Sequence, residues 1–161
     1  MGVYWVDSDV FIQAKNGPYG FDIAPGFWKH LDKSLRNGSI CSSEMVYREL
    51  VGYSDQLAVW VKNRKGIGIS VPICPAVEVH YTAIANHVYQ HYDVPNSNLF
   101  LSGADGWIIA HALHSKGTVV SQESDQHPQA HKVRIPDVCS AFSVRCIHLV
   151  AMLREQGASL K

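Results

Sequence analysis

The sequence predicts an α/β fold, a three-layer α/β/α sandwich built on a mainly parallel sheet. Short apolar runs rich in Val and aromatic residues recur along the chain and have the length of buried strands. Segments with apolar residues at helical spacing separate these runs, which is the pattern of βα units that join parallel strands. The 161 residues fit a single domain, which we expect to cover residues 1–161.

Composition and charge exclude several classes of protein. Hydrophobic residues make up 47% of the chain, which is enough to bury a core and argues against disorder. The 14 basic residues are balanced by 14 acidic ones, which counts against a protein that coats nucleic acid but not against an enzyme with a local basic rim. No apolar run approaches the ~20 residues needed to span a bilayer. The start of the chain does not resemble a signal peptide, so we expect a cytoplasmic protein without a membrane partner. The four cysteines fit no zinc pattern, so we expect reduced thiols.

The first half of the chain predicts two strands, each followed by helix. In chain order the expected elements are a strand at Val3–Val6, a Gly- and Pro-rich loop at Asn16–Gly20, a helix at Pro25–Leu35, a strand at Ser39–Cys41, a helix capped by Ser42 or Ser43, and a helix at Asp55–Lys62. Pro at a first helical position and Asn-Gly beyond the last one delimit the first helix, and a serine hydroxyl is a favourable cap for the second.

The second half predicts a longer series of elements. They are a strand-like or loop stretch at Gly66–Pro75, a helix at Ala76–His91, a turn region at Asp93–Asn98, a helix at Ala104–His114, a strand at Thr118–Ser121, a polar loop at Gln122–His131, a strand at Val144–Ile147 and a terminal helix at Leu149–Gln156. Val77, Tyr81, Ile84 and Val88 recur at helical spacing in the first of these helices, and β-branched residues mark the strand at Thr118–Ser121.

Four carboxylates that are far apart in the sequence fall where a parallel sheet places its chemistry. Asp7 directly follows the first strand, and Glu123 lies two residues beyond the strand at Thr118–Ser121. Glu49 lies in the helix after the second strand, and Asp105 lies in the first turn of its helix. Because ligands of open α/β sheets bind beyond the carboxyl ends of the strands, we expect these acids to meet at one rim.

Gathered carboxylates predict a hard divalent cation, Mg²⁺ or Mn²⁺. Both ions prefer oxygen ligands, and a bound cation removes the repulsion that crowded carboxylates would otherwise suffer. A simpler role is open for each acid alone. Asp105 could complement a helix dipole, Asp7 could form a turn, Glu49 could be an exposed helix acid, and Glu123 could be an ordinary loop residue. The prediction of a metal site therefore depends on the joint arrangement.

Several segments resemble the PIN-domain ribonucleases in order and spacing over most of the chain. The four motifs of that family are similar to Val6–Phe11, Ser42–Leu50, Ala104–Ala110 and Thr118–Glu123. Two further segments, Tyr19–Trp28 and Val133–Cys139, look like a PIN-like branch usually labelled a domain of unknown function.

The resemblance implies an endoribonuclease that hydrolyses RNA phosphodiester bonds with Mg²⁺ or Mn²⁺. The metal-binding and catalytic acids that it implies are Asp7, Glu49, Asp105 and Glu123. The residues that we expect to bind substrate are Ser8, Asp9, Lys15 and Ser121. Many such proteins resemble VapC-type toxins, so an RNA substrate, a cognate antitoxin and a homodimer are the implied partners. The chain departs from the family pattern at Asp9, where Asn, Ser or Thr is commoner, and at Glu123, where Asp is commoner.

Two other functions stay open. The chain could be a PIN-fold binding protein with weak or lost catalysis, which its neutral charge favours. It could also be another doubly wound phosphohydrolase that uses Asp7 as its nucleophile. Three further kinds of site are unsupported. The sequence contains no P-loop for nucleotides, no G-x-S-x-G motif of a serine hydrolase and no H-E-x-x-H motif of a zinc protease.

Overall fold

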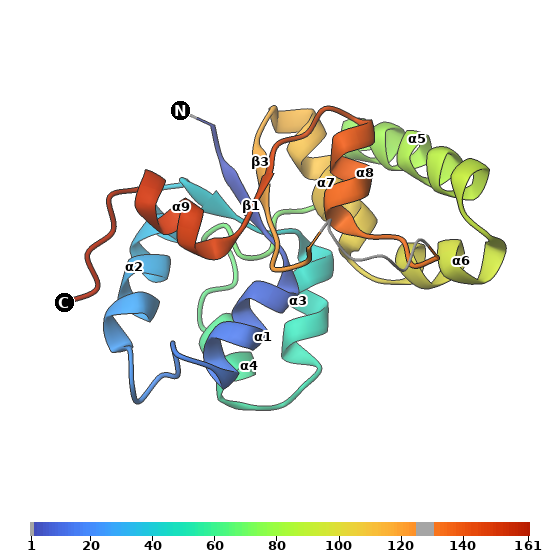
Figure 1. Cartoon of the computed structure of the whole chain (residues 1–161). Helices are drawn as coiled ribbons and strands as arrows, with labels where there is room; N and C mark the ends of the chain where they lie inside the picture. The colour runs from blue at the N-terminus through green and yellow to red at the C-terminus, as the bar shows by residue number, and fades with distance from the viewer. Residues whose placement is uncertain (1, 125–130) are drawn as a thin grey trace.

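A four-stranded parallel sheet forms the centre of the computed structural model, which describes residues 2–124 and 131–161 (Figure 1). The strands are β1 (Tyr4–Val6), β2 (Ile40–Cys41), β3 (Thr118–Val120) and β4 (Cys146–Ile147). Their order across the sheet is β2-β1-β3-β4, and every pair is parallel. Val6 pairs with Val120, so β1 and β3 end side by side at the centre of the sheet.

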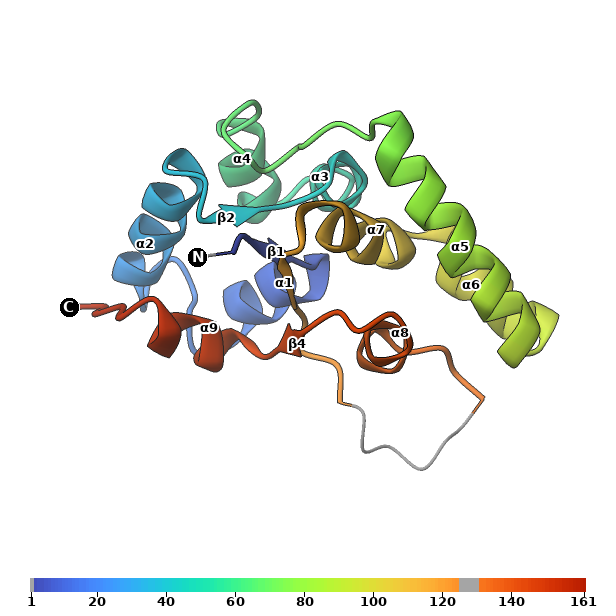
Figure 2. The same ribbon diagram turned by 90° about the horizontal axis from the view of Figure 1, so that it is seen from above.

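Nine helices surround this sheet within the described residues. They are α1 (Ser8–Asn16), α2 (Pro25–Arg36), α3 (Glu44–Val51), α4 (Gln56–Lys62), α5 (Pro75–His91), α6 (Val94–Ser102), α7 (Asp105–Ser115), α8 (Ile135–Ala141) and α9 (Leu149–Glu155). Helices α2 and α9 lie on one side of the strands and α7 and α8 on the other, while α5 and α6 lie outside α7 (Figure 2). The predicted fold class, an α/β/α sandwich with a parallel sheet, is confirmed.

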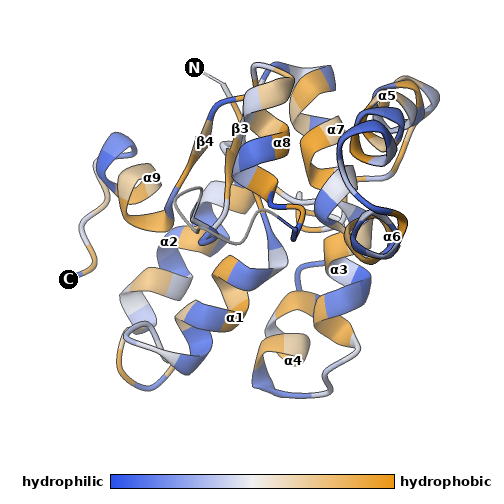
Figure 3. Cartoon of the chain, turned by 45° about the vertical axis from the view of Figure 1, so that its right-hand side comes forward, coloured by the Kyte–Doolittle hydropathy of each residue, from blue (hydrophilic) through white to orange (hydrophobic). Residues whose placement is uncertain are grey.

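Helix α7 is the best covered helix of the fold because it is packed between the sheet and α5. Its buried residues are Gly106, Ile108, Ile109, Ala110, His111 and Ala112, and most of its ribbon has the hydrophobic colour (Figure 3). Residues around the whole circumference of a helix are buried when both of its sides are covered. The first turn of α7 is thereby fixed against the end of the sheet.

The buried His111 is the polar exception on α7. Its ring stacks on the Trp5 ring at a centroid distance of 4.6 Å, and its Nε2 lies 3.1 Å from the Ser43 hydroxyl. Ser43 also caps α3 by accepting a hydrogen bond from the Met45 N–H. Burial lowers the pKa of His111 to about 4, so the ring is neutral in the folded protein at neutral pH.

Three helices differ from the prediction. The expected turn at Asp93–Asn98 is wrong, because Asp93 caps α6 by accepting a hydrogen bond from the Asn96 N–H, and the proline lies in the first helical turn. Helix α1 begins directly after β1, where we predicted no element, and α8 occupies a segment that was also left unassigned. Asp, Asn and Pro are favoured at both turns and helix starts, so their presence alone could not separate the two.

The remaining elements follow the prediction to within a few residues at their ends. The Gly66–Pro75 stretch forms turns and an isolated parallel bridge between Ser43 and Val71. Part of the predicted polar loop at Gln122–His131 lies outside the described residues, which omit 125–130. No disulfide joins the cysteines within the described residues. Within residues 2–124 and 131–161 the structure contains no helix of the length and apolarity needed to cross a bilayer, and the cytoplasmic location stays a prediction.

Candidate active site

Asp7 lies where β1 passes into α1, at the carboxyl ends of the two central strands. Its N–H donates to the Val120 carbonyl at 3.0 Å, which extends the pairing of β1 with β3 by one residue. Its carboxylate accepts a hydrogen bond from the Ser8 N–H at 2.8 Å and so caps α1. Asp7 is only 2% exposed, so the backbone holds this carboxylate inside the protein.

Asp9 places a second carboxyl group within hydrogen-bonding reach of Asp7. Burial, followed by the charges of Asp9 and Asp105, raises the pKa of Asp7 well above its usual value. Burial also raises the pKa of Asp9, against hydrogen bonding from its neighbours that lowers it. The Oδ1 atom of Asp9 is buried and has no hydrogen-bond partner among the described residues. A buried acceptor without a donor is uncommon, and it marks this position as a candidate for cation binding.

Glu49 of α3 joins two other parts of the site. Its Oε2 accepts a hydrogen bond from the Ser8 hydroxyl at 2.8 Å, and its Oε1 accepts one from the Ala104 N–H at 2.8 Å, just before α7. A Cβ at Gly103 would lie 3.0 Å from Oε1, so glycine leaves the space in which the carboxylate sits. Glu49 thus connects α3 to the starts of α1 and α7.

Asp105 is the first residue of α7, and the charges of three other acids act on its carboxylate. Burial is the largest cause that raises its pKa to about 7, and the charges of Glu123, Glu49 and Asp9 add to this effect. The positive charge of Lys132 acts in the opposite direction. Asp105 is therefore electrostatically connected to acids from three other parts of the chain.

Glu123 follows β3 and contacts the start of α8. Its N–H donates to the Ser121 hydroxyl at 3.2 Å, and its Oε2 accepts a hydrogen bond from the Ile135 N–H at 2.9 Å. Burial raises the pKa of Glu123, and the hydrogen bond from Ile135 partly opposes that rise. The buried Ser121 therefore orients the backbone from which this acid projects.

We call Asp7, Asp9, Glu49, Asp105 and Glu123 the acidic rim. Its members come from the end of β1, from α1, from α3, from the start of α7 and from the segment after β3. The structure thus brings all four predicted acids into one electrostatically interacting group. Asp9 was predicted to bind substrate, and its contact with Asp7 makes it a fifth carboxylate of this group.

His148 is a neighbour of the rim that the sequence did not identify. Its Nδ1 lies 2.9 Å from the Ser121 carbonyl oxygen, and its charge lowers the pKa of Asp9. A small cavity of about 80 Å³ lies between His148 and Glu123. A single histidine at the start of α9 carries no sequence signal of its own, since only the pairing of β4 with β3 brings it to this place.

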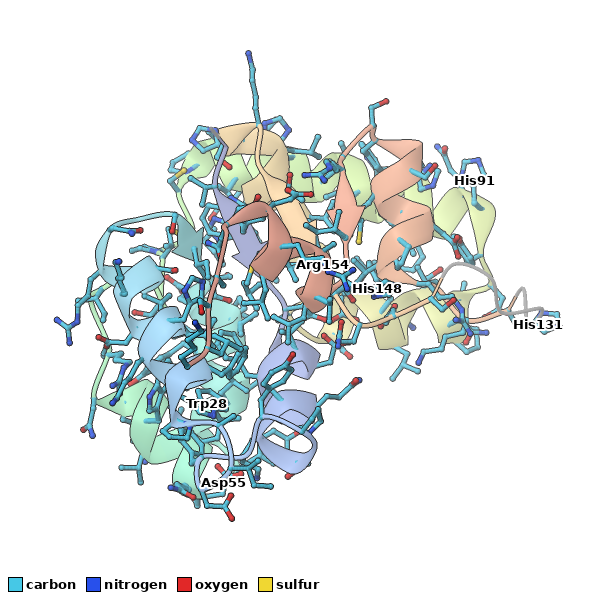
Figure 4. The ribbon with its side chains drawn as sticks, turned by 60° about the vertical axis from the view of Figure 1, so that its left-hand side comes forward. Trp28, Asp55, His91, His131, His148 and Arg154 are labelled. Atoms are coloured by element: carbon cyan, nitrogen blue, oxygen red, sulfur yellow. The ribbon has the colours of Figure 1, made fainter. Side chains whose placement is uncertain are left out.

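Lys15 is the one predicted site residue that the structure places elsewhere. It lies eight residues beyond Asp7, which is about 12 Å along a helix. Its Nζ forms an ion pair with Asp55 at 2.6 Å. In Figure 4, Asp55 lies at the foot of the molecule, well below His148. The geometry therefore gives no support to substrate binding by Lys15, whereas Ser8 and Ser121 both contact rim residues.

The rim meets one test of a cation site and does not meet another. The parts of the chain that the structure describes contain no group of three or more His, Cys, Asp or Glu side chains placed so that they could hold a metal ion. However, the buried Oδ1 of Asp9 lacks a donor, and the rim carboxyls raise one another's pKa. A divalent cation would remove both costs, and carboxylate oxygens are the ligands that Mg²⁺ and Mn²⁺ prefer. The chemistry of the donors present therefore fits such an ion.

Comparisons with other proteins place the chain beside one family and one fold. The model of a family described as a domain of unknown function, DUF4411, matches residues 4–160. A search for curated relatives found no match. A solved structure of VapBC2 from Rickettsia felis, bound to a DNA fragment from their promoter, contains a chain that is similar with a TM-score of 0.57. The two chains are 14% identical, and the match covers 91% of this chain and 98% of the other. At this identity the likeness demonstrates a shared fold.

Proposed function

The chain belongs to the DUF4411 family, and from this membership and the acidic rim we propose that residues 1–161 form a PIN-type endoribonuclease that depends on Mg²⁺ or Mn²⁺. One observation carries the proposal. Five carboxylates from separate elements are crowded at the carboxyl end of a parallel sheet, and a buried oxygen of Asp9 has no donor among the described residues. Such crowding lowers stability, and a divalent cation is the chemical species that would relieve it.

The rim residues would share the binding of the cation. Asp7, Asp9 and Asp105 would hold it most directly, because their charges act on one another. Glu49 and Glu123 already accept hydrogen bonds, yet carboxylate oxygens retain further lone pairs for the ion or its waters. When bound, the cation would supply an activated water and offset negative charge on a phosphoryl oxygen.

Neighbouring groups of this chain would keep the carboxylates in place. The Ser8 hydroxyl and the Ala104 N–H each donate to one oxygen of Glu49, which fixes its orientation. The Ile135 N–H donates to Glu123. Donors of this kind limit the motion of metal-binding side chains, and their loss commonly weakens metal affinity about 10- to 100-fold.

RNA as substrate and a protein partner are parts of the same proposal. The support is the resemblance of the motifs to PIN-domain ribonucleases and the likeness of the fold to a chain of VapBC2. By analogy we expect the chain to be the toxin of a toxin–antitoxin pair, held by a cognate antitoxin, and to form a homodimer. Co-expression with the product of an adjacent gene, followed by size-exclusion chromatography with light scattering, would test both associations.

Metal binding and RNA cleavage test the proposal together. We expect Mn²⁺ to bind in a calorimetric titration near pH 7.5 and single-stranded RNA to be cleaved only with Mg²⁺ or Mn²⁺ present. Asp7→Asn and Asp105→Asn should each lower cleavage by more than about a hundredfold while the circular dichroism spectrum is unchanged. Glu78→Gln, which neutralises an exposed acid in the first turn of α5, is the matched control and should cleave normally. Full metal-dependent cleavage by both rim variants would defeat the proposal.

A binding protein of the same fold is the second candidate. Two observations favour it, namely the balanced charge of the chain and the lack, among the described residues, of any group of three or more side chains that could hold a metal ion. Mn²⁺ binding that is absent, or that persists unchanged in Asp7→Asn, would select this function. A phosphohydrolase with Asp7 as nucleophile has less support, because Asp7 is 2% exposed and caps α1. Trapping a phosphoaspartate at Asp7 would reverse that judgement.

A further inference from the structure

A second pocket adjoins the acidic rim on the side of α6. It has a volume of about 260 Å³ and lies between α6 and the segment that leads into α8. Asp105 and Glu123 of the rim form part of its lining, so the pocket opens directly beside the proposed metal site. The volume is slightly below the range of about 300–1,000 Å³ that is typical of sites for drug-sized ligands. A single small ring system is therefore the appropriate size of occupant.

The pocket has an apolar part formed by Leu99, Phe100 and Val133. Phe100 and Val133 are almost fully buried, whereas Leu99 is 66% exposed. Such an exposed leucine beside a pocket offers a surface on which a flat ring can lie. The Leu99 carbonyl accepts a hydrogen bond from the Ser102 hydroxyl at 2.7 Å, whereas its side chain is mostly exposed to solvent beside the pocket.

The polar part of the pocket consists mainly of hydrogen-bond acceptors. The side-chain amide nitrogen of Asn96 donates to both carboxylate oxygens of Asp93, at 3.0 and 2.9 Å, so its Oδ1 is left as an acceptor. Asp105 and Glu123 contribute carboxylate oxygens. Lys132 is the positive group at this pocket, and its charge acts on both of these rim acids.

We propose that this pocket binds one unstacked nucleobase of a single-stranded RNA, next to the phosphodiester that the acidic rim cleaves, and that it favours cytosine and adenine through their exocyclic amino group. The inference rests on the proposed function and specifies its substrate. An apolar wall accommodates the face of the base, and a wall of acceptors accepts hydrogen bonds from its amino edge. Lys132 contacts a flanking phosphate. A base inside a duplex could not enter a pocket of this depth without leaving its stack.

Base identity follows from the acceptors. The amino group of cytosine or adenine carries two N–H donors, which can serve Asn96 Oδ1 and a rim carboxylate together. The Watson–Crick edge of uracil has a carbonyl at the corresponding position, and this carbonyl would face carboxylate oxygens. We therefore expect cytidine to bind about tenfold more tightly than uridine, which has the same ring size.

Neutral nucleosides test the pocket without the metal and without cleavage. Wild-type protein in EDTA at about pH 8.5, where the Asp105 carboxyl with its pKa of about 7 is ionised, is titrated with cytidine, adenosine and uridine while methyl NMR signals are followed. Cytidine and adenosine should shift the signals of Leu99 and Val133, and Leu99→Ala should weaken cytidine binding about tenfold. Val94→Ala is the matched control, because Val94 lies on the same helix, is 60% exposed and does not line the pocket. Equal binding of uridine, or equal affinities of the two variants, overturns the proposal.

The outcome is separable from that of the nuclease proposal. Asp7 does not line the pocket, so Asp7→Asn should bind cytidine like the wild type whether or not it cleaves RNA. If Leu99→Ala leaves metal-dependent cleavage unchanged and cytidine does not shift the signals of Leu99, the base-pocket proposal is wrong and the nuclease proposal stands. If the protein binds cytidine but does not cleave RNA, the pocket proposal stands and the nuclease proposal is wrong.

Discussion

Replacing Asp105 with Asn should make the metal-free protein more stable, although it removes a proposed metal ligand. The carboxyl of Asp105 is largely buried, the charges of Glu123, Glu49 and Asp9 act on it, and its pKa is raised to about 7. Asn has nearly the same shape and carries no charge. No hydrogen bond to this carboxylate occurs within residues 2–124 and 131–161, so the substitution sacrifices none there. The expected gain in stability is thus the repulsion and desolvation that the charge now costs.

The size of the effect follows from proton linkage. The folded state keeps the proton of Asp105 up to about pH 7, whereas the unfolded chain releases it near the ordinary value of 3.8. The wild-type protein therefore loses stability as the pH rises from about 4 to about 7, and the variant lacks this loss. A difference of about three pH units corresponds to at most about 4 kcal/mol at pH 8. The two proteins should be nearly equal in stability near pH 4.

Urea unfolding followed by tryptophan fluorescence, in EDTA and at several pH values between 4 and 8, measures this difference. Glu78→Gln is the control, because it also neutralises an acid in the first turn of a helix but an exposed one. Its small effect reports the helix dipole alone. If the free energy of unfolding of Asp105→Asn does not exceed that of the wild type at pH 8, or if the gain is the same at every pH, the charge of Asp105 does not destabilise the folded protein.

Three further predictions concern positions outside the rim. His111, with a pKa lowered to about 4, should cost the wild type roughly 3 kcal/mol of stability as the pH falls from about 6.5 to about 4. His111→Gln should lack that slope in urea unfolding, while His114→Gln on the same helix should retain it. Gly117→Ala should lower stability by about 1–3 kcal/mol, since its Cβ would lie 2.6 Å from a backbone carbonyl, whereas Gly52→Ala, with contacts no closer than 3.4 Å, should not. Lys15→Gln should leave RNA cleavage unchanged, because Lys15 pairs with Asp55. A loss of cleavage above about tenfold would instead show that Lys15 binds the substrate.

The strands could be predicted from the sequence because buried parallel strands are continuous apolar runs. Val3–Val6 and Thr118–Ser121 stand out as such runs, and both overlap observed strands. Helices α1 and α6 were missed for a different reason. Their first residues are polar or turn-forming, and Asp93 supports a helix only through its hydrogen bonds to Asn96. Whether such residues start a helix or a turn depends on what covers the following residues.

The acids of the site could be anticipated from topology, but the contacts between them could not. The rule that sites lie at the carboxyl ends of strands leads to Asp7 and Glu123 without any distance. The carboxyl groups of Asp7 and Asp9 come within hydrogen-bonding reach of each other because of the first turn of α1, and the sequence did not reveal that helix. The pocket beside the rim depends on where α6 packs. The sequence alone therefore did not indicate that Leu99 lines a pocket. Lys15 pairs with Asp55 because helix α1, which the sequence did not reveal, carries it away from the rim, and its role in substrate binding stays a prediction.

The two hydrogen bonds of Glu49 have a consequence for binding at the proposed metal site. Both of its oxygens are already held, one by the Ser8 hydroxyl and the other by the Ala104 N–H. A free glutamate would lose up to about 1.5–2 kcal/mol of rotamer freedom on being fixed, and here that loss is incurred during folding. The Glu49 side chain therefore does not have to change conformation when a cation binds. It should be equally well ordered in the metal-free and the metal-bound protein.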